Sequence, residues 1–116
     1  MKSVRCFIAD MDSAFVRQVC RAVSDARDID VVGACPNGLV ALRQIALLQP
    51  DVVLADIQLP ELDGISLLTE TRRLRRVPSV IICTHFYSEY SMECASRSGN
   101  VTKIGQRGAR TSEFVL

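Results

Sequence analysis

Residues 50–64 read PDVVLADIQLPELDG and hold the strongest structural signal in the chain. The apolar run that follows Asp51 is short, carries no charge and ends at Asp56, as expected of a buried strand. Pro60 and Gly64 lie four and eight residues after Asp56, so the strand should pass through a shaped loop into a helix. A strand that is apolar on both faces is typical of a parallel sheet covered by helices, and the segment therefore predicts an α/β fold.

The rest of the chain repeats this alternation. Short apolar runs alternate with segments in which apolar residues recur at the spacing of a helix face. The pattern predicts a doubly wound parallel sheet, flavodoxin-like in topology, with helices on both faces. The first helix is expected to begin at Asp12 or Ser13, either of which can cap it. The expected strands are residues 4–10, 29–35, 51–56 and 79–84, and the later helices are residues 39–48, 65–76 and 87–97.

Size and composition narrow the classes of protein. The chain has 116 residues, which suits one domain with one core. Hydrophobic residues make up 48% and the net charge is +1, so neither nucleic acid nor a membrane surface is expected as a partner. No segment has the length and apolarity of a membrane helix or a secretion signal, so we expect a cytoplasmic location. The five cysteines form no CxxC pair and are expected to be reduced and mostly buried.

Polar residues gather where the predicted strands end. Asp10 and Asp12 follow the first strand, Asp56 ends the third, and Thr84 ends the fourth. Ligands of such sheets bind beyond the carboxyl ends of the strands, near the point where the strand order switches. Three carboxylates held close together repel one another unless a cation or a proton joins them. The pattern therefore favours magnesium, with an aspartate available as a nucleophile toward phosphorus.

The segment of residues 50–64 resembles the phosphorylation segment of response-regulator receiver domains, the phosphoacceptor modules of two-component signalling. In that family an aspartate at a strand end is followed by proline four residues on and glycine eight residues on, which here are Asp56, Pro60 and Gly64. The resemblance covers residues 4–99 of this sequence. Its loop is most similar to the receiver of the sporulation-initiation regulator of spore-forming bacteria. The resemblance implies bound magnesium and a histidine kinase or phosphotransfer protein as the phosphoryl donor.

The resemblance assigns roles residue by residue. Asp56 matches the phosphoacceptor, and Asp10 matches the first residue of the acidic pair that holds the metal. Gln58 matches the position whose backbone carbonyl binds the metal, and Thr84 matches the hydroxyl residue that moves to bond the phosphoryl group. These roles imply a signalling protein rather than an enzyme, which changes its partner interactions on phosphorylation. They also imply weak self-dephosphorylation, because the acylphosphates of such domains hydrolyse.

The acidic pair departs from the family pattern. Met11 stands where the family has its second acid, and a thioether is a poor ligand for a hard cation. Asp12 is next along the chain and has two interpretations, a substitute metal ligand or the cap of the following helix. We favour the cap, which leaves Asp10, Asp56 and the Gln58 carbonyl to hold magnesium weakly.

The segment after residue 99 also departs from the family. The family has a fifth strand, a lysine before a proline, and a fifth helix, whereas counting without gaps places Gln106 on the lysine position. Lys103 is then a secondary candidate for the phosphate-binding lysine. We therefore expect a receiver domain over residues 1–99 and an atypical segment over residues 100–116, in which the fifth strand or helix is incomplete. Apolar surface left uncovered there favours a homodimer.

Two other functions remain open. A degenerate receiver would keep the fold and bind a partner without phosphorylation, which Met11 favours and the intact acceptor loop opposes. The sequence Asp10-Met11-Asp12 also resembles the nucleophile motif of haloacid-dehalogenase-type phosphatases, with Asp10 as the nucleophile and Asp12 as the acid. The late acidic pair of that family is missing from the sequence. No output domain is visible, so we expect either a stand-alone receiver or a fragment.

Overall fold

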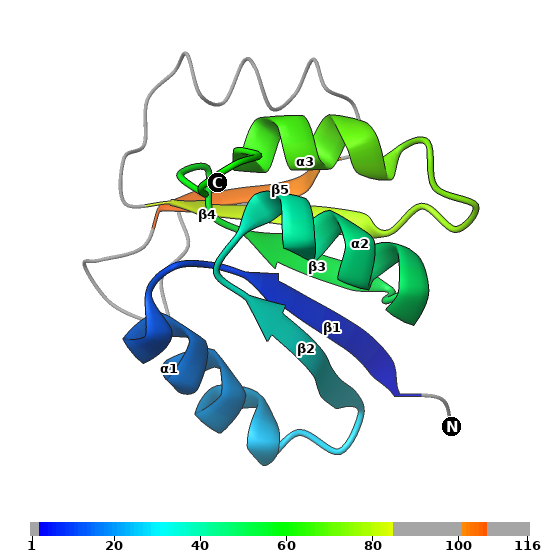
Figure 1. Cartoon of the computed structure of the whole chain (residues 1–116). Coiled ribbons are helices and arrows are strands. Elements are labelled where there is room, and N and C mark those ends of the chain that lie inside the picture. Colours follow the sequence, from blue (N-terminus) through cyan, green and yellow to red (C-terminus); the bar gives the residue numbers. More distant parts are fainter. Residues whose placement is uncertain (1–2, 85–100, 107–116) are drawn as a thin grey trace.

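Strands and helices alternate along the chain as the sequence predicts (Figure 1). The computed structural model describes residues 3–84 and 101–106, with the second range and Thr84 described by their backbone alone. Five strands form one sheet, and helices follow the first three strands. The elements are β1 (Val4–Ala9), α1 (Ser13–Ser24), β2 (Ile29–Cys35), α2 (Gly38–Leu48), β3 (Val52–Ala55), α3 (Gly64–Thr71), β4 (Ser79–Thr84) and β5 (Val101–Gln106).

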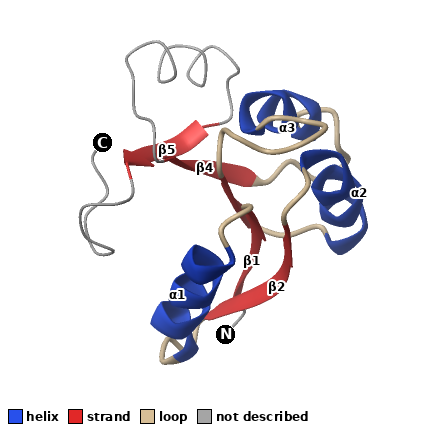
Figure 2. Ribbon diagram, turned by 60° about the vertical axis from the view of Figure 1, so that its left-hand side comes forward, coloured by secondary structure: helices blue, strands red, loops and turns tan. Residues whose placement is uncertain are grey.

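The strand order in the sheet is β2-β1-β3-β4-β5, and every pairing is parallel. The chain begins in β1, passes outward to β2, and then crosses to β3 on the other side of β1. α1 covers one face of the sheet, whereas α2 and α3 lie together on the other (Figure 2). The predicted doubly wound, flavodoxin-like fold is confirmed. The switch in strand order falls between β1 and β3, where ligands of such folds bind.

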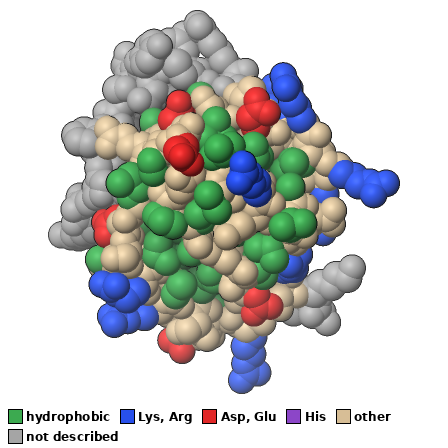
Figure 3. Space-filling view, viewed as in Figure 1, with side chains coloured by type: hydrophobic (Ala, Val, Ile, Leu, Met, Phe, Trp, Pro, Cys, Tyr) green, Lys and Arg blue, Asp and Glu red, His purple; other side chains and the backbone are tan. Residues whose placement is uncertain are grey.

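The main core lies between the sheet and the layer formed by α2 and α3. Alternate residues of the three central strands face these helices, because successive side chains of a strand point to opposite sides. Figure 3 shows this side of the molecule, where hydrophobic side chains also reach the surface, and Leu47 of α2 is 84% exposed. The core strand residues are Phe7, Ala9, Val53, Ala55, Val80 and Ile82, and the helix residues are Ala41, Ile45, Leu67 and Leu68.

Side chains just before each helix satisfy its first backbone donors. Asp12 Oδ1 accepts hydrogen bonds of 3.0 and 3.2 Å from the second and third N–H groups of α1. Asn37 and Asp63 cap α2 and α3 in the same way. Of the two candidate caps for the first helix, the structure selects Asp12. The second helix starts at Gly38, directly after its cap.

The third helix is shorter than its sequence pattern predicts. Apolar residues recur at helical spacing over residues 65–76, whereas α3 covers Gly64–Thr71. From Arg72 the backbone hydrogen bonds are of the tighter i→i+3 kind. Four arginines within residues 72–76 repel one another along a helix, and Pro78 disfavours helix in the residue before it. These costs outweigh the short apolar stripe, so the prediction of a helix to residue 76 is wrong.

None of the four cysteines in the described part of the chain forms a disulfide. Cys6, Cys35 and Cys83 are buried, and Cys20 is half-buried. Burial, with a smaller contribution from Cys20, raises the pKa of the Cys6 thiol to about 11, so this thiol stays neutral at physiological pH. The prediction of reduced, mostly buried cysteines is confirmed for these four, and Cys94 lies outside the described residues.

The last strand pairs irregularly. β5 runs parallel to β4, with a register shift between Val80 and Ile81. The predicted helix at residues 87–97 and the expectation about a fifth helix lie outside the described residues. Among the helices that the structure describes, none is long and apolar enough to cross a lipid bilayer.

Candidate functional site

Two buried aspartates lie at the carboxyl ends of neighbouring strands. Asp10 follows β1 and Asp56 follows β3, and these strands pair up to Ala9 and Ala55. The Asp56 N–H donates to the Ala9 carbonyl at 2.9 Å, and the Asp10 N–H donates to the Cys35 carbonyl at 3.0 Å. Asp10 is 4% exposed and Asp56 is 6% exposed. The prediction that both lie at one edge of the sheet, with β1 next to β3, is confirmed.

Burial makes these two carboxylates the main electrostatic feature of the site. Two carboxylates largely removed from water at adjacent strand ends need hydrogen-bond donors or a positive charge as partners. One donor is the Asp12 N–H, which bonds to Asp10 Oδ1 at 2.8 Å and so fixes one oxygen of that carboxylate. A pair of this kind is suited to a hard cation and to the electrophilic phosphorus of a phosphoryl group.

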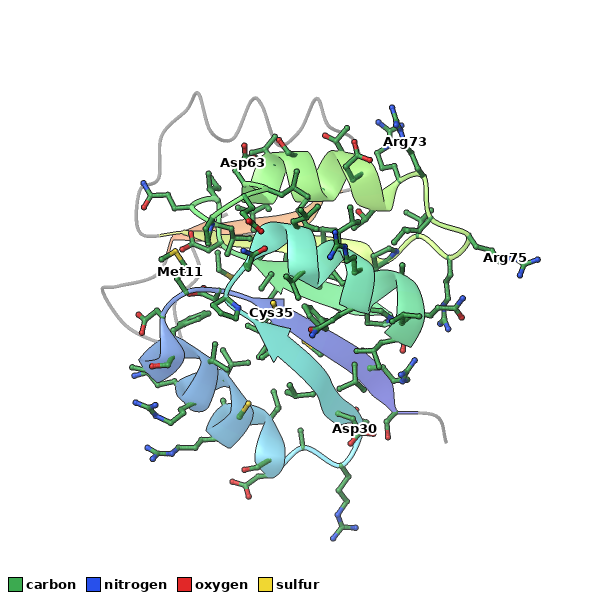
Figure 4. The ribbon with its side chains drawn as sticks, viewed as in Figure 1. Met11, Asp30, Cys35, Asp63, Arg73 and Arg75 are labelled. Carbon is green, nitrogen blue, oxygen red and sulfur yellow. The ribbon has the colours of Figure 1, made fainter. Side chains whose placement is uncertain are left out.

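Met11 and Asp12, the next two residues, have other environments. Met11 is 60% exposed and lies at the same end of the molecule as Asp63 (Figure 4). Asp12 caps α1, so the interpretation that we favoured from the sequence is confirmed. A role for Asp12 as a metal ligand would compete with that cap.

The acceptor loop, residues 57–63, is closed at its base by Gly64. The Gly64 N–H donates to the Ile57 carbonyl at 2.8 Å. A Cβ on Gly64 would lie 2.1 Å from the Asp56 carbonyl oxygen, so a side chain there would displace the backbone of Asp56 itself. This contact explains physically why a residue without a side chain stands eight positions after Asp56.

Thr84 and Lys103 are placed by their backbones. Thr84 ends β4, the strand next to β3, so its Cα lies at the same edge of the sheet as the two aspartates. Gln106 pairs with Thr84 at that edge, whereas Lys103 pairs with Ile81, three residues earlier along β4. The roles of Thr84 and Lys103 therefore stay predictions. The register places Gln106 at the end of β5, and its match to the lysine position of the family stays a prediction.

Magnesium is the cofactor that the resemblance implies, and the site offers a small set of oxygen ligands that fits it. Asp10 and Asp56 offer hard oxygen ligands, and the backbone carbonyl of the exposed Gln58 is the third candidate. Among the residues that the structure describes, no group of three or more His, Cys, Asp and Glu side chains is arranged to hold a metal. Magnesium commonly binds through one or two carboxylates and keeps several waters, so two aspartates suffice.

One feature of the site was missed in the sequence. Asn37 Nδ2 donates to Glu61 Oε2 at 2.9 Å, which ties the start of α2 to the acceptor loop. The two residues are 24 positions apart. A Pro-Asn-Gly turn predicts a helix start, but no local pattern indicates which distant loop will lie against it.

Comparisons with known proteins agree with one another. The family model described as the response regulator receiver domain matches residues 6–104, which extends past the expected boundary at residue 99. The protein-glutamate methylesterase/protein-glutamine glutaminase of Nitrosomonas europaea is 39% identical over 85 residues, which span 72% of this chain and 24% of that relative. Among solved structures, the signal receiver domain of the response regulator NarL from Mycobacterium tuberculosis superposes with a TM-score of 0.88 at 25% identity, covering 97% of this chain and 90% of that one. The response regulator domain of CheB from Thermotoga maritima superposes with a TM-score of 0.80 at 26% identity, covering 93% of this chain and 81% of that one.

Proposed function

This chain belongs to the response regulator receiver domain family, and we propose that it accepts a phosphoryl group on Asp56. The observation that carries the proposal is the burial of Asp56 beside Asp10 at the carboxyl edge of the sheet, on a loop fixed by Gly64. The donor is a histidine kinase or a phosphotransfer protein of the cytoplasm. Phosphorylation then changes how the Thr84 side of the domain contacts its partners.

The chemistry follows from the position of the acceptor. A carboxylate oxygen of Asp56 attacks phosphorus and forms an acylphosphate, while the bond from phosphorus to the donor imidazole nitrogen breaks and its electron pair stays on that nitrogen. Asp10, held by the Asp12 N–H, keeps a second oxygen donor beside the reacting group. Bound magnesium supplies positive charge against the phosphoryl oxygens. Water later attacks the same phosphorus, the bond from phosphorus to the Asp56 oxygen breaks, and inorganic phosphate leaves the restored carboxylate. This step gives the weak self-dephosphorylation expected from the resemblance.

A finer proposal concerns the protein around this domain. The chain spans only 24% of the methylesterase relative from Nitrosomonas europaea, whose named activity we assign to the part outside the match. We infer that Asp56 controls an output of this kind. The similarity of the acceptor loop to the sporulation-initiation receiver is the competing proposal, and identity over 72% of this chain favours the methylesterase. Release of methyl esters from protein glutamates by the full-length protein, with and without Asp56→Asn, distinguishes the two.

The phosphorylation-independent module is the remaining alternative. The exposed position of Met11 is compatible with it, but the buried acidic pair and the closed acceptor loop support a working acceptor. The phosphatase interpretation of Asp12 as an acid loses support, because its carboxylate caps α1. A homodimer stays part of the proposal, with light scattering as its measurement.

Intact mass after incubation with acetyl phosphate and magnesium tests the main proposal. The wild-type chain should gain the mass of one phosphoryl group, and Asp56→Asn should gain none. If the folded wild-type chain gains no mass, or if Asp56→Asn gains as much as the wild type, phosphorylation at Asp56 is excluded. The first of these outcomes would favour the phosphorylation-independent module.

A further inference from the structure

The acceptor loop rests on the start of α2. The Gly38 N–H, at the first position of that helix, donates to the Pro60 carbonyl at 3.0 Å. The first N–H groups of a helix have no partner within it, so the loop satisfies one of these donors. The Leu62 N–H also donates to the Pro60 carbonyl, at 2.8 Å. The centre of the loop is therefore attached to α2 through one carbonyl oxygen.

Gly38 allows this attachment because it has no side chain. A Cβ on Gly38 would lie 1.6 Å from the Leu62 carbonyl oxygen and 2.7 Å from its carbon. Both atoms belong to the backbone, so no rotamer change can relieve the overlap. Any substitution at Gly38 must move either the acceptor loop or the start of α2.

A side-chain hydrogen bond joins the same two segments. Asn37 Oδ1 accepts from the N–H groups of Leu39 and Val40 at 3.0 Å each, while Asn37 Nδ2 donates to Glu61 Oε2 at 2.9 Å. Glu61 has a φ of 67°, a left-handed conformation that is costly for a residue with a side chain. Asn37 thus caps the helix and holds the turn of the loop at once.

We propose that Asn37 and Gly38 are positioning residues for phosphoryl transfer to Asp56. The proposal rests on the proposed function of Asp56. The hydrogen bond from Gly64 to Ile57 closes the base of the loop, and the bond from Gly38 to Pro60 holds its centre. Gln58 lies between Ile57 and Pro60 along the chain. A shift at the centre of the loop therefore moves a candidate ligand relative to the acceptor.

Small displacements have large kinetic effects at such a site. A misplacement of about 1 Å in a reacting geometry can slow a reaction by on the order of a hundredfold. We expect Gly38→Ala to slow phosphoryl uptake from acetyl phosphate by roughly tenfold or more, and to weaken magnesium binding. Gly33→Ala is the matched control, because a Cβ on Gly33 meets core side chains, with the Phe7 ring at 2.9 Å and Leu48 Cδ1 at 3.2 Å.

The experiment measures the initial rate of mass gain and the melting temperature of both variants. Gly33→Ala should lower the melting temperature with an unchanged rate of uptake by the folded protein, whereas Gly38→Ala should lower the rate. Equal rates in Gly38→Ala and the wild type would overturn the proposal. A fall of the same size in both glycine variants would also overturn it, because general destabilisation would then account for the effect.

Two milder variants test the side-chain bond if Gly38→Ala does not fold. Asn37→Ser keeps a capping oxygen but removes the donor to Glu61. Glu61→Gly removes the acceptor and suits the left-handed backbone. Each should slow uptake by a few-fold, the double variant should be no slower than the worse single variant, and Glu61→Gln should retain the wild-type rate. Additive effects of the two substitutions, or a slow Glu61→Gln variant, would contradict a shared bond.

Amide hydrogen exchange separates this proposal from the function on which it rests. If the wild-type chain takes up no phosphoryl group, the proposed function fails. Exchange at the Gly38 and Gly64 N–H groups still reports whether the acceptor loop is attached to α2. Glu61→Gly should speed exchange at Gly38 in the unphosphorylated protein. Unchanged exchange there would overturn the attachment of the loop to α2.

Discussion

Two aspartates stand at opposite ends of β3 and have opposite environments. Asp51 precedes the strand at the amino edge of the sheet, and Asp56 follows it at the carboxyl edge. Asp51 Oδ2 accepts from the Arg5 N–H at 2.8 Å, and Oδ1 pairs with the Arg76 guanidinium. Asp56 is instead buried beside a second carboxylate, that of Asp10. One carboxylate joins neighbouring segments, whereas the other lies buried at the end of its strand.

The network around Asp51 has a measurable electrostatic consequence. The backbone N–H of Arg5, helped by the charges of Arg76 and Arg5 and opposed by desolvation, lowers the pKa of the Asp51 carboxyl below its usual 3.8. The Arg5 guanidinium also donates to the carbonyls of Leu48 and Gln49 at the end of α2, at 2.6 and 3.1 Å. A cation there suits the negative end of the helix dipole.

The comparison shows that the two edges of the sheet offer an aspartate different neighbours. In a parallel sheet the helices that follow the strands begin at the carboxyl edge and end at the amino edge. Helix starts present N–H donors that favour anions, and helix ends present carbonyls that favour cations. Figure 4 shows the two edges, with Met11 and Asp63 at one end of the molecule and Asp30 and Arg75 at the other.

The largest effect is expected at Asp10. Asp10→Asn keeps the shape of the side chain but removes a negative charge next to Asp56, so phosphoryl uptake from acetyl phosphate should slow by roughly a hundredfold. Asp51→Asn, at the other end of β3, should keep the rate within about twofold, because it is remote from the site. Initial rates of mass gain check this contrast. Equal losses in both variants would mean that the two ends of the strand do not differ in function.

Met11→Asp should raise the magnesium affinity of the site at the carboxyl edge. A third carboxylate next to Asp10 restores an oxygen ligand for a hard cation, so magnesium affinity should rise by on the order of tenfold. Titration calorimetry or fluorescence measures the change, with Asp12→Asn as the control that should alter affinity little. If Asp12→Asn abolishes binding while Met11→Asp adds nothing, Asp12 is the ligand and our assignment of the acidic pair is wrong.

Asp12→Ala separates the capping role from the site. Loss of the two hydrogen bonds to the start of α1 should lower the free energy of unfolding by about 1 kcal/mol, with magnesium affinity nearly unchanged. Urea unfolding measures the stability, and Asp12→Ser, which retains a capping oxygen, should recover most of it. No loss of stability in Asp12→Ala would show that the cap does not stabilise the fold.

Low pH should remove the contribution of Asp51 to the stability of the fold. Its pKa is lower in the folded chain than in the unfolded chain, so its contribution to stability is present above about pH 4 and is lost as the pH falls through the folded value. Between about pH 5 and pH 3 the wild type should therefore lose more stability than Asp51→Asn. Melting temperatures across this range check the sign, with Asp30→Asn, an exposed aspartate of β2, as the control. A wild type and an Asp51→Asn variant that lose stability equally would contradict it.

The contacts that the sequence did not predict join segments far apart in the chain. Arg5 and Asp51 are 46 positions apart, and Asn37 and Glu61 are 24 apart. Neither residue of either pair carries a local signal of its partner, because the pairing arises only when β1, β3 and α2 have packed. The early end of α3 has a local origin instead, in the four arginines of residues 72–76 and in Pro78.

The sequence by itself determined the alternation of strands and helices, the apolar strand interiors, a helix start at Asp12 or Ser13 and the placement of Asp10 and Asp56 at strand ends. These features depend on neighbours within a few residues, where the two-residue period of a strand and the 3.6-residue period of a helix act directly. Only the tertiary structure decided that Gly38 must lack a side chain. That requirement comes from the Leu62 carbonyl, which reaches Gly38 only after β2, β1 and β3 lie side by side and bring α2 against the acceptor loop.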